Sequence, residues 1–214
     1  MGGDAGVSVL LVHGGLWEDI GADWFWRRTG VIDGLERRGF AVTAPDRLRR
    51  APDWAAEAAH LAAAVRAGGL AGPSLTVLAG SFGCAAAVRL ALDFPGLAGR
   101  LVLAWPASIA DQFTAIRFRA GLSRLGAKGK TLDALLGTGT LPSASDAELR
   151  SLGLPAGIVP AVPPTPLHPR SAVDTLLRVL PAAVELPGCP EAPRPEFAAH
   201  LDAFLDSVTA FISP

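Results

Sequence analysis

The strongest chemical signal in the chain is the stretch VLAGSFGCAAAVRLAL, residues 77–92. Ser81 stands between an apolar run and a helix-forming run, and small residues at 79, 80 and 83 let the backbone turn sharply there. Such a turn lifts the serine hydroxyl above the end of a sheet and points a helix N-terminus at developing negative charge. The pattern matches the nucleophile elbow Gly-x-Ser-x-Gly, with Ala79 in place of the first glycine. The alternative is a turn in which Ser81 only caps the helix. We favour the elbow because the strand, the turn and the helix follow one another at the spacing of that motif.

A second signal, LLVHGGLWED at residues 10–19, directly follows the first expected strand. In a His-Gly-Gly loop the backbone N–H of Gly15 or Leu16 is available as a donor for an oxyanion hole. Phe82, the residue after Ser81, would supply the other donor. The alternative is a loop whose glycines merely permit tight packing. Because the loop occurs together with the elbow, we interpret it as the oxyanion loop and assign His13 to it.

Strand and helix patterns alternate along the chain and predict one α/β domain over residues 1–214. Expected strands lie at 7–12, 40–44, 74–79, 100–105, 157–162 and 182–186. Expected helices lie at 22–38, 52–68, 81–94, 171–180 and 195–212. This order predicts a doubly wound, mainly parallel sheet of about six strands. Residues 108–156 interrupt the alternation with three short helical patterns, and we interpret them as an inserted helical cap.

The two motifs, with GFAVTAPDR (39–47) between them, strongly resemble the α/β-hydrolase family. The resemblance runs nearly end to end, and it includes the insertion after LVLAWPA and the ELPGC strand near the C-terminus. It implies that Ser81 is a nucleophile, that an acid follows the strand at 157–162, and that a histidine follows the strand at 182–186.

Both partners of Ser81 depart from the pattern of that family. The stretch TPLHP (165–169) has Thr165 in the acid position, and Glu191 occupies the histidine position. A serine hydroxyl is a poor nucleophile near neutral pH unless a base accepts its proton. A set of Ser81, Thr165 and Glu191 therefore does not form an ordinary proton relay.

Two residues are candidates for the missing base. His168 lies three residues past Thr165 and would reach Ser81 if its loop turned inward; a partly exposed histidine between prolines is the simpler alternative. Glu191 would serve as a carboxylate base if an apolar pocket raised its pKa; a solvated loop glutamate is its alternative.

The segment RFRAGLSRLGAKGK (117–130) is basic and contains no acidic residue. A solvated face of the cap is the default interpretation. The sharper hypothesis is a docking surface for an acidic partner, such as an acyl carrier protein or a coenzyme A tail. Its basic residues are Arg117, Arg119, Arg124, Lys128 and Lys130.

Composition excludes several classes of function. A net charge of −1 gives no electrostatic reason to expect nucleic acid or a membrane surface as partner. The apolar runs are interrupted by Pro or Gly well below the ~20 residues of a membrane span. The two cysteines, Cys84 and Cys189, lack metal-ligand spacing, so we expect no metal, no cofactor and a reducing, cytoplasmic setting.

Three functions remain, and an enzyme is favoured because the elbow and the oxyanion loop occur together. The leading hypothesis is an atypical serine hydrolase or acyl transferase, an esterase or thioesterase with a degenerate triad, that acts on a small-molecule ester or thioester through Ser81. The second is a non-hydrolytic lyase, isomerase or cyclase in which Glu191 moves a proton of the substrate. The third is a catalytically silent binding protein on the same fold.

Overall fold

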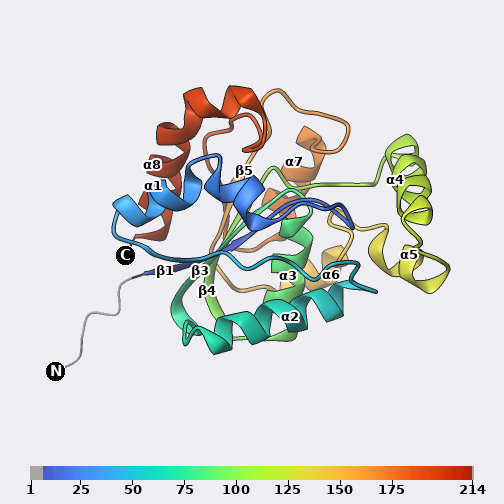
Figure 1. The fold of residues 1–214 in the computed structure, drawn as a ribbon, viewed down its shortest axis with the longest axis horizontal. Helices are drawn as coiled ribbons and strands as arrows, with labels where there is room; N and C mark the ends of the chain where they lie inside the picture. The colour runs from blue at the N-terminus through green and yellow to red at the C-terminus, as the bar shows by residue number, and fades with distance from the viewer. Residues whose placement is uncertain (1–6, 214) are drawn as a thin grey trace.

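The computed structural model describes residues 7–213, which form one six-stranded sheet with helices on both faces (Figure 1). The strand order is β2-β1-β3-β4-β5-β6, and every neighbouring pair is parallel. The predicted α/β fold and its six strands are confirmed. The strands are β1 (Ser8–Val12), β2 (Ala41–Thr43), β3 (Gly72–Gly80), β4 (Ala98–Ala104), β5 (Ala156–Val159) and β6 (Ala183–Glu185).

The sheet separates two apolar cores because successive side chains of a strand point to opposite faces. Leu10 and Val12 of β1 belong to one core, whereas Val9 and Leu11 belong to the other. The first core is covered by α2 (Trp54–Ala67), α3 (Gly83–Asp93) and α7 (Arg170–Val179). The second core is covered by α1 (Val31–Arg37) and α8 (Leu201–Ile212), which contact each other.

Two of the helices predicted from the sequence are each divided into two segments in the structure. The helix expected at 22–38 is divided into a π-helical turn, η1 (Asp23–Arg27), and α1, because Gly30 between them adopts φ +83°. The helix expected at 195–212 begins as a 3-10 helix, η2 (Pro195–His200), and continues as α8. None of the helices in residues 7–213 has the length and apolar run that crossing a bilayer requires.

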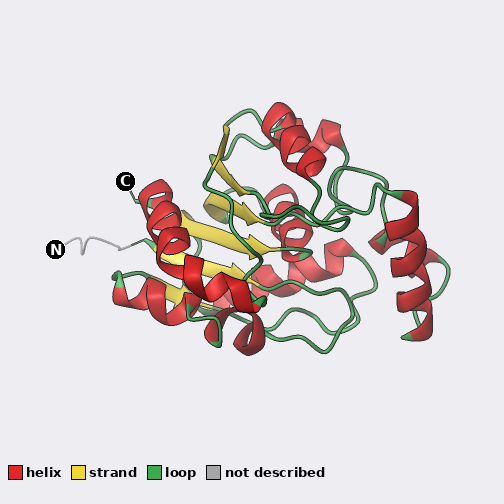
Figure 2. Cartoon of the chain, turned by 90° about the horizontal axis from the view of Figure 1, so that it is seen from above, coloured by secondary structure: helices red, strands yellow, loops and turns green. Residues whose placement is uncertain are grey.

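The strand register brings four chain segments to one edge of the sheet. Val12 of β1 pairs with Ala79, Gly80 of β3 pairs with Ala104, and Ala104 of β4 pairs with Val159. The strands therefore end nearly level, side by side in Figure 2, and the loops that follow them meet at the carboxyl edge. In open α/β sheets this edge is where ligands bind.

Three helices lie in the chain between β4 and β5: α4 (Gln112–Arg124), α5 (Lys130–Leu135) and α6 (Asp146–Ser151). The Asp111 side chain caps α4 by accepting from the Thr114 N–H at 2.7 Å, and Ser145 and Glu148 form a capping box on α6. α4 and α5 stand beyond the carboxyl edge of the sheet (Figure 1). The boundaries 108–156 of a separate cap stay a prediction.

A change at Gly83 tests the close packing of α3 on β1. A Cβ atom there would collide with the carbonyl oxygen of Val12 and lie 2.6 Å from that of His13, and backbone cannot move aside cheaply. We expect Gly83→Ala to lower the free energy of unfolding by about 1–3 kcal/mol in urea denaturation. The control is Gly121→Ala in α4, where a Cβ meets nothing within 4 Å and helix propensity improves. Equal effects of the two changes would contradict this packing.

Candidate active site

Ser81 occupies the sharp turn that connects β3 to α3. Its φ of +53° lies in the left-handed region, which is unfavourable for a residue with a side chain. The turn is held by the Ser81 N–H, which donates to the Ala104 carbonyl at 3.0 Å. Gly80 is required beside it because a Cβ there would lie 2.6 Å from the ring of Phe25. The backbone therefore sets the Ser81 hydroxyl at the N-terminal end of α3.

His168 lies on the loop between β5 and α7 and reaches Ser81. Its Nε2 is 2.9 Å from the Ser81 Oγ, and only 5% of the residue is exposed, so the simpler expectation of an exposed loop histidine is wrong. The loop turns inward because the Thr165 N–H donates to the His168 carbonyl at 3.2 Å. In return, the His168 N–H donates to the Thr165 Oγ1 at 3.1 Å.

Thr165 also contacts the other ring nitrogen of His168. Its Oγ1 lies 3.4 Å from the His168 Nδ1, and in the tautomer with the proton on Nδ1 the Nε2 accepts from the Ser81 hydroxyl. Thr165 thus lies against the ring nitrogen that the acid of a triad contacts. It carries no charge, however, so it does not stabilise an imidazolium as a carboxylate would.

Glu191, on the loop after β6, faces the same nitrogen of His168 as Ser81 does. Its Oε1 lies 3.7 Å from the His168 Nε2, and 17% of its side chain is exposed, so the expectation of a solvated glutamate is wrong. Burial raises the pKa of Glu191, and Arg194, whose Nε is 3.8 Å away, acts in the opposite direction. The carboxylate is therefore on the Ser81 side of the ring and makes no contact with Nδ1.

The protonation state of His168 decides whether its contact with Glu191 is an ion pair. Burial lowers the pKa of His168 to about 4, and the positive charge of Arg194 adds to the effect. At neutral pH the imidazole is neutral, so its approach to Glu191 becomes an ion pair only when the ring takes up a proton. The site holds a neutral serine–histidine pair beside a carboxylate.

The predicted oxyanion loop packs directly against Ser81. A Cβ placed on Gly14 would lie 3.0 Å from the Ser81 Cβ, and Gly15 has φ +83°. Within residues 7–213, the N–H groups of Gly15, Leu16 and Phe82 have no hydrogen-bond acceptor. Their convergence on one point near the Ser81 hydroxyl stays a prediction.

A cavity of about 270 Å³ lies over Ser81. Apolar rings form much of its wall, and Phe118 of α4 meets Phe82 edge-on with 5.0 Å between ring centroids. Glu18, Glu191 and Arg194 supply its charges. In residues 7–213 no three His, Cys, Asp or Glu side chains are grouped to bind a metal ion.

Three residues of this wall were not among the site residues predicted from the sequence. Arg194 follows Glu191 by three positions, a spacing that permits pairing. Glu18 lies in the same loop as the glycines, where its acidic side chain is a signal of a polar site. Phe118 lies in the segment noted only for its basic residues. Hydrophobicity does not distinguish a ring that lines a cavity from one in a core.

No protein-family model matches the chain, and no curated protein matches its sequence. Its fold nevertheless matches solved α/β-hydrolase structures. One is an α/β-hydrolase enzyme from a sediment metagenome of the lagoon of Mar Chica, Morocco, with a TM-score of 0.70 and 19% identity over 96% of this chain and 90% of that one.

Two further structures are similar to the same extent. A meta-cleavage product hydrolase from Pseudomonas fluorescens matches with a TM-score of 0.71 and 17% identity, over 96% of this chain and 90% of that one. An esterase from Rhodococcus sp. matches with a TM-score of 0.66 and 18% identity, over 97% of this chain and 90% of that one. The chain has the α/β-hydrolase fold.

The buried histidines predict a loss of stability in acid. Burial lowers the pKa of both His13 and His168 from 6.5 to about 4. Because the folded-state pKa is the lower one, the unfolded chain binds more protons between these values, and stability falls as the pH drops through them. We expect the free energy of unfolding to fall by up to roughly 3 kcal/mol for each histidine. Urea denaturation between about pH 7 and pH 4 measures this.

The matched pair of variants isolates the contribution of one histidine. His168→Gln should flatten the loss of stability in acid, whereas His200→Gln, at an exposed side chain, should leave it as in the wild type. The same pH dependence in the wild type and in His168→Gln would refute the assignment of a buried neutral imidazole.

Proposed function

We propose that the protein is a serine hydrolase of small-molecule acyl esters or thioesters, with Ser81 as nucleophile and His168 as base. The observation that carries this proposal is the 2.9 Å contact between the Ser81 Oγ and the His168 Nε2 beneath the cavity. Nucleophile and base within hydrogen-bond distance, with a third group orienting the base, are the geometric signature of this chemistry. The α/β-hydrolase fold supports the same reaction class by analogy.

In the proposed acylation step, the Ser81 Oγ attacks the acyl carbon while the His168 Nε2 accepts the hydroxyl proton. The oxyanion receives hydrogen bonds from the Phe82 N–H and from Gly15 or Leu16. The protonated imidazole then donates to the leaving alcohol or thiol, and an acyl-Ser81 ester remains. In deacylation His168 removes a proton from water as the water oxygen attacks the acyl carbon, and the imidazolium then returns this proton to the Ser81 Oγ as the acid is released. An acceptor alcohol or thiol in place of water gives acyl transfer.

Relative to the family pattern, the base and the carboxylate have exchanged loops. His168 comes from the loop after β5 and Glu191 from the loop after β6. Both loops end at the same edge of the sheet, so either can reach Ser81. Glu191 offers a countercharge to the imidazolium from the Nε2 side, which Thr165 does not supply. We expect turnover slower than that of a serine hydrolase with a complete triad, because Nδ1 lacks an anionic partner.

The second candidate function is proton transfer on a substrate without covalent catalysis. It is favoured by Glu191 alone, a carboxylate in the cavity whose pKa is raised by burial. In that case Glu191 takes a proton from the substrate, and the amides near Ser81 stabilise an enolate-like oxygen. Ser81 is then dispensable, which separates the two candidates.

Labelling with a fluorophosphonate probe tests the proposal. We expect the wild type to be labelled and Ser81→Ala to remain unlabelled, because the probe needs an activated serine. His168→Gln should slow labelling by about 10²–10³-fold, since it removes the base. Glu191→Gln should slow it far less, because the carboxylate only offers a countercharge. The matched control is Ser108→Ala, another buried serine near the carboxyl edge, which should be labelled like the wild type.

The outcomes separate the three candidate functions. Labelling that is independent of His168 would place the base elsewhere. A wild type without labelling, with turnover that needs Glu191 but not Ser81, would support the proton-transfer enzyme. Neither labelling nor turnover would support a binding protein.

We also propose that the basic segment of α4 binds the anionic part of an acyl carrier. Arg117 and Arg124 line a groove of about 560 Å³ that shares Glu18, Phe118 and Leu167 with the Ser81 cavity. A substrate whose acyl group lies at Ser81 would extend along this groove past two guanidinium groups. Such charges favour a phosphate-bearing carrier, as in coenzyme A or an acyl carrier protein.

Kinetics of charged and uncharged substrates test the groove. We expect the double change Arg117→Gln and Arg124→Gln to raise the KM of an acyl-coenzyme A by roughly tenfold. The KM for an uncharged thioester should stay within about twofold, since it lacks the anionic group. The control is Arg119→Gln, because Arg119 is already paired with Asp133 at 2.9 Å. Equal effects on the two substrates would refute the groove as an anion site.

A further inference from the structure

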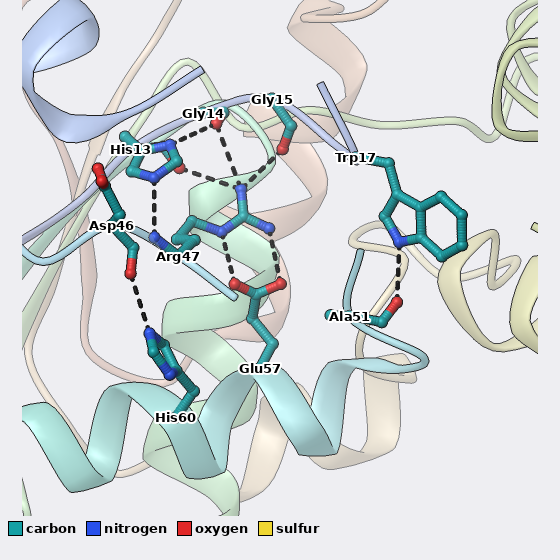
Figure 3. A network of polar contacts seen from close by, with 9 residues as sticks. All are labelled: His13, Gly14, Gly15, Trp17, Asp46, Arg47, Ala51, Glu57 and His60. Atoms are coloured by element: carbon teal, nitrogen blue, oxygen red, sulfur yellow. Dashed lines mark hydrogen bonds and ion pairs between the residues drawn. The ribbon is translucent and has the colours of Figure 1, made fainter. Parts of the chain in front are cut away.

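Arg47 and Glu57 form a buried ion pair beside the loop that follows β1, in which Gly15 lines the cavity over Ser81. The two side chains are 6% and 2% exposed, and the Arg47 Nε and Nη2 donate to the two carboxylate oxygens at 2.9 Å and 3.2 Å (Figure 3). Glu57 lies in the first turn of α2, and the Trp54 ring of the same turn is 5.9 Å from the Arg47 guanidinium carbon. A fork-to-fork pair of this kind fixes both position and orientation of the guanidinium.

The remaining nitrogen of Arg47 contacts three consecutive carbonyl oxygens of the loop. The Nη1 lies 2.7 Å from the oxygen of Gly15, 3.1 Å from that of His13 and 3.4 Å from that of Gly14 (Figure 3). In a trans peptide the carbonyl and the next N–H point in opposite directions. Holding the carbonyls of Gly14 and Gly15 toward Arg47 therefore turns the N–H groups of Gly15 and Leu16 away from it.

The other side of the loop is the side of Ser81. Gly14 abuts the Ser81 Cβ, and Gly15 lines the cavity. Because the carbonyls of Gly14 and Gly15 converge on Arg47, the N–H groups of Gly15 and Leu16 lie on the opposite side of the loop. This is the arrangement of a backbone nest that binds anions, and the φ of +83° at Gly15 permits this backbone conformation. Neither amide has a hydrogen-bond acceptor within residues 7–213.

The His13 imidazole stabilises the same loop. Its Nε2 accepts from the Arg47 N–H at 2.9 Å, and its Nδ1 is 2.8 Å from the Gly14 carbonyl oxygen. Only the tautomer with the proton on Nδ1 satisfies both contacts. Burial, with the positive charge of Arg47 second, lowers the pKa of His13 to about 4, so this neutral tautomer persists at neutral pH.

We propose that Arg47, oriented by Glu57, is a positioning residue that aims the amides of Gly15 and Leu16 at the oxyanion formed on Ser81. This inference rests on the proposed function. Buried ion pairs are often no more stabilising than apolar residues of the same volume. Stability of the fold therefore does not by itself account for the Arg47–Glu57 pair. Orienting the carbonyls of residues 13–15, in contrast, requires a hydrogen-bond donor such as Arg47.

The test compares two double variants that replace an ion pair by apolar residues. Arg47→Met with Glu57→Leu removes the donor to the loop without leaving a buried charge unpaired. Arg89→Met with Glu148→Leu is the control: Arg89 also joins a carboxylate, at 2.9 Å, to a carbonyl, that of Ser143 at 3.3 Å, and it lies outside the site. Thermal unfolding of both variants establishes that they are folded.

Turnover of an activated ester and inhibition by a phenylboronic acid are the functional measurements. We expect the Arg47 and Glu57 variant to lose about 10²-fold in kcat with KM within about threefold, since an oxyanion donor acts only in the transition state. Its affinity for the boronate, which forms an anionic tetrahedral adduct, should fall by a similar factor. The control variant should stay within about threefold of the wild type in kcat. Arg47→Lys should fall between them because it keeps the charge without the fork.

A direct readout keeps the inference separate from the proposed function. The amide NMR signals of Gly15 and Leu16 should shift or broaden in the Arg47 and Glu57 variant and not in the control. Unchanged amide signals would overturn the inference, as would a kcat loss no larger than that of the control. If Ser81→Ala leaves turnover intact while these amides respond as expected, the proposed function fails and with it the oxyanion on Ser81, and only the positioning of the two amides by Arg47 stands.

Discussion

The left-handed backbone of Ser81 is the constraint on which the site depends. A φ of +53° costs a residue with a side chain on the order of 1–2 kcal/mol, so the surrounding chain has to enforce it. Gly80 and Gly83 do so by their lack of a Cβ: the first admits the Phe25 ring, and the second lets α3 pack against the carbonyls that end β1. The same contact fixes the distance between Ser81 and the His13–Leu16 loop. The close packing around Gly80 and Gly83 thus sets both the backbone conformation of Ser81 and the distance to its candidate oxyanion donors.

The position of His168, the proposed base, depends on a different local feature, the hydrogen-bonded turn between Thr165 and His168. Its two backbone-linked hydrogen bonds bring the imidazole inward. The Ser108 N–H, which donates to the Leu167 carbonyl at 2.8 Å, holds this loop against the loop that follows β4. A neutral hydroxyl, that of Thr165, then lies beside the Nδ1 of His168, where the acid of a triad would carry a charge.

Much of the fold was predictable because it depends on local signals. Strand and helix periodicity gave every strand and most helices, and the Gly-rich turn around Ser81 is a local pattern with a backbone cause. The side-chain partners were less predictable. Whether His168 is exposed or buried depends on a turn three residues long, and sequence does not fix the direction of such a turn between prolines. The break at Gly30 was missed because a single glycine is tolerated within many helices.

Arg47 shows a further limit of sequence reasoning. Its partners are Glu57, ten residues ahead, and carbonyls of residues 13–15, which carry no side-chain signal at all. An arginine in the stretch PDRLRR resembles its neighbours Arg49 and Arg50, which lie on the surface. Only the register of β1 with β2, which brings the ends of the two strands together, distinguishes them. Backbone-directed interactions of this kind become visible only in three dimensions.

The charges around Ser81 are arranged to match the charge separation of the proposed reaction. Attack by Ser81 creates an oxyanion near the loop that Arg47 holds and an imidazolium near Glu191. Burial opposes the second charge: with a pKa of about 4, His168 takes up a proton at a cost roughly 3 kcal/mol greater than a histidine in water. Under the proposed mechanism this cost falls on the attack step with every substrate, because His168 accepts the Ser81 proton before the leaving group departs. A thiol, with a pKa of about 8.5, leaves with less protonation than an alkyl alcohol does. A thioester would therefore depend less than an alkyl ester on proton transfer to its leaving group, which suits the phosphate-bearing acyl carrier proposed for the groove.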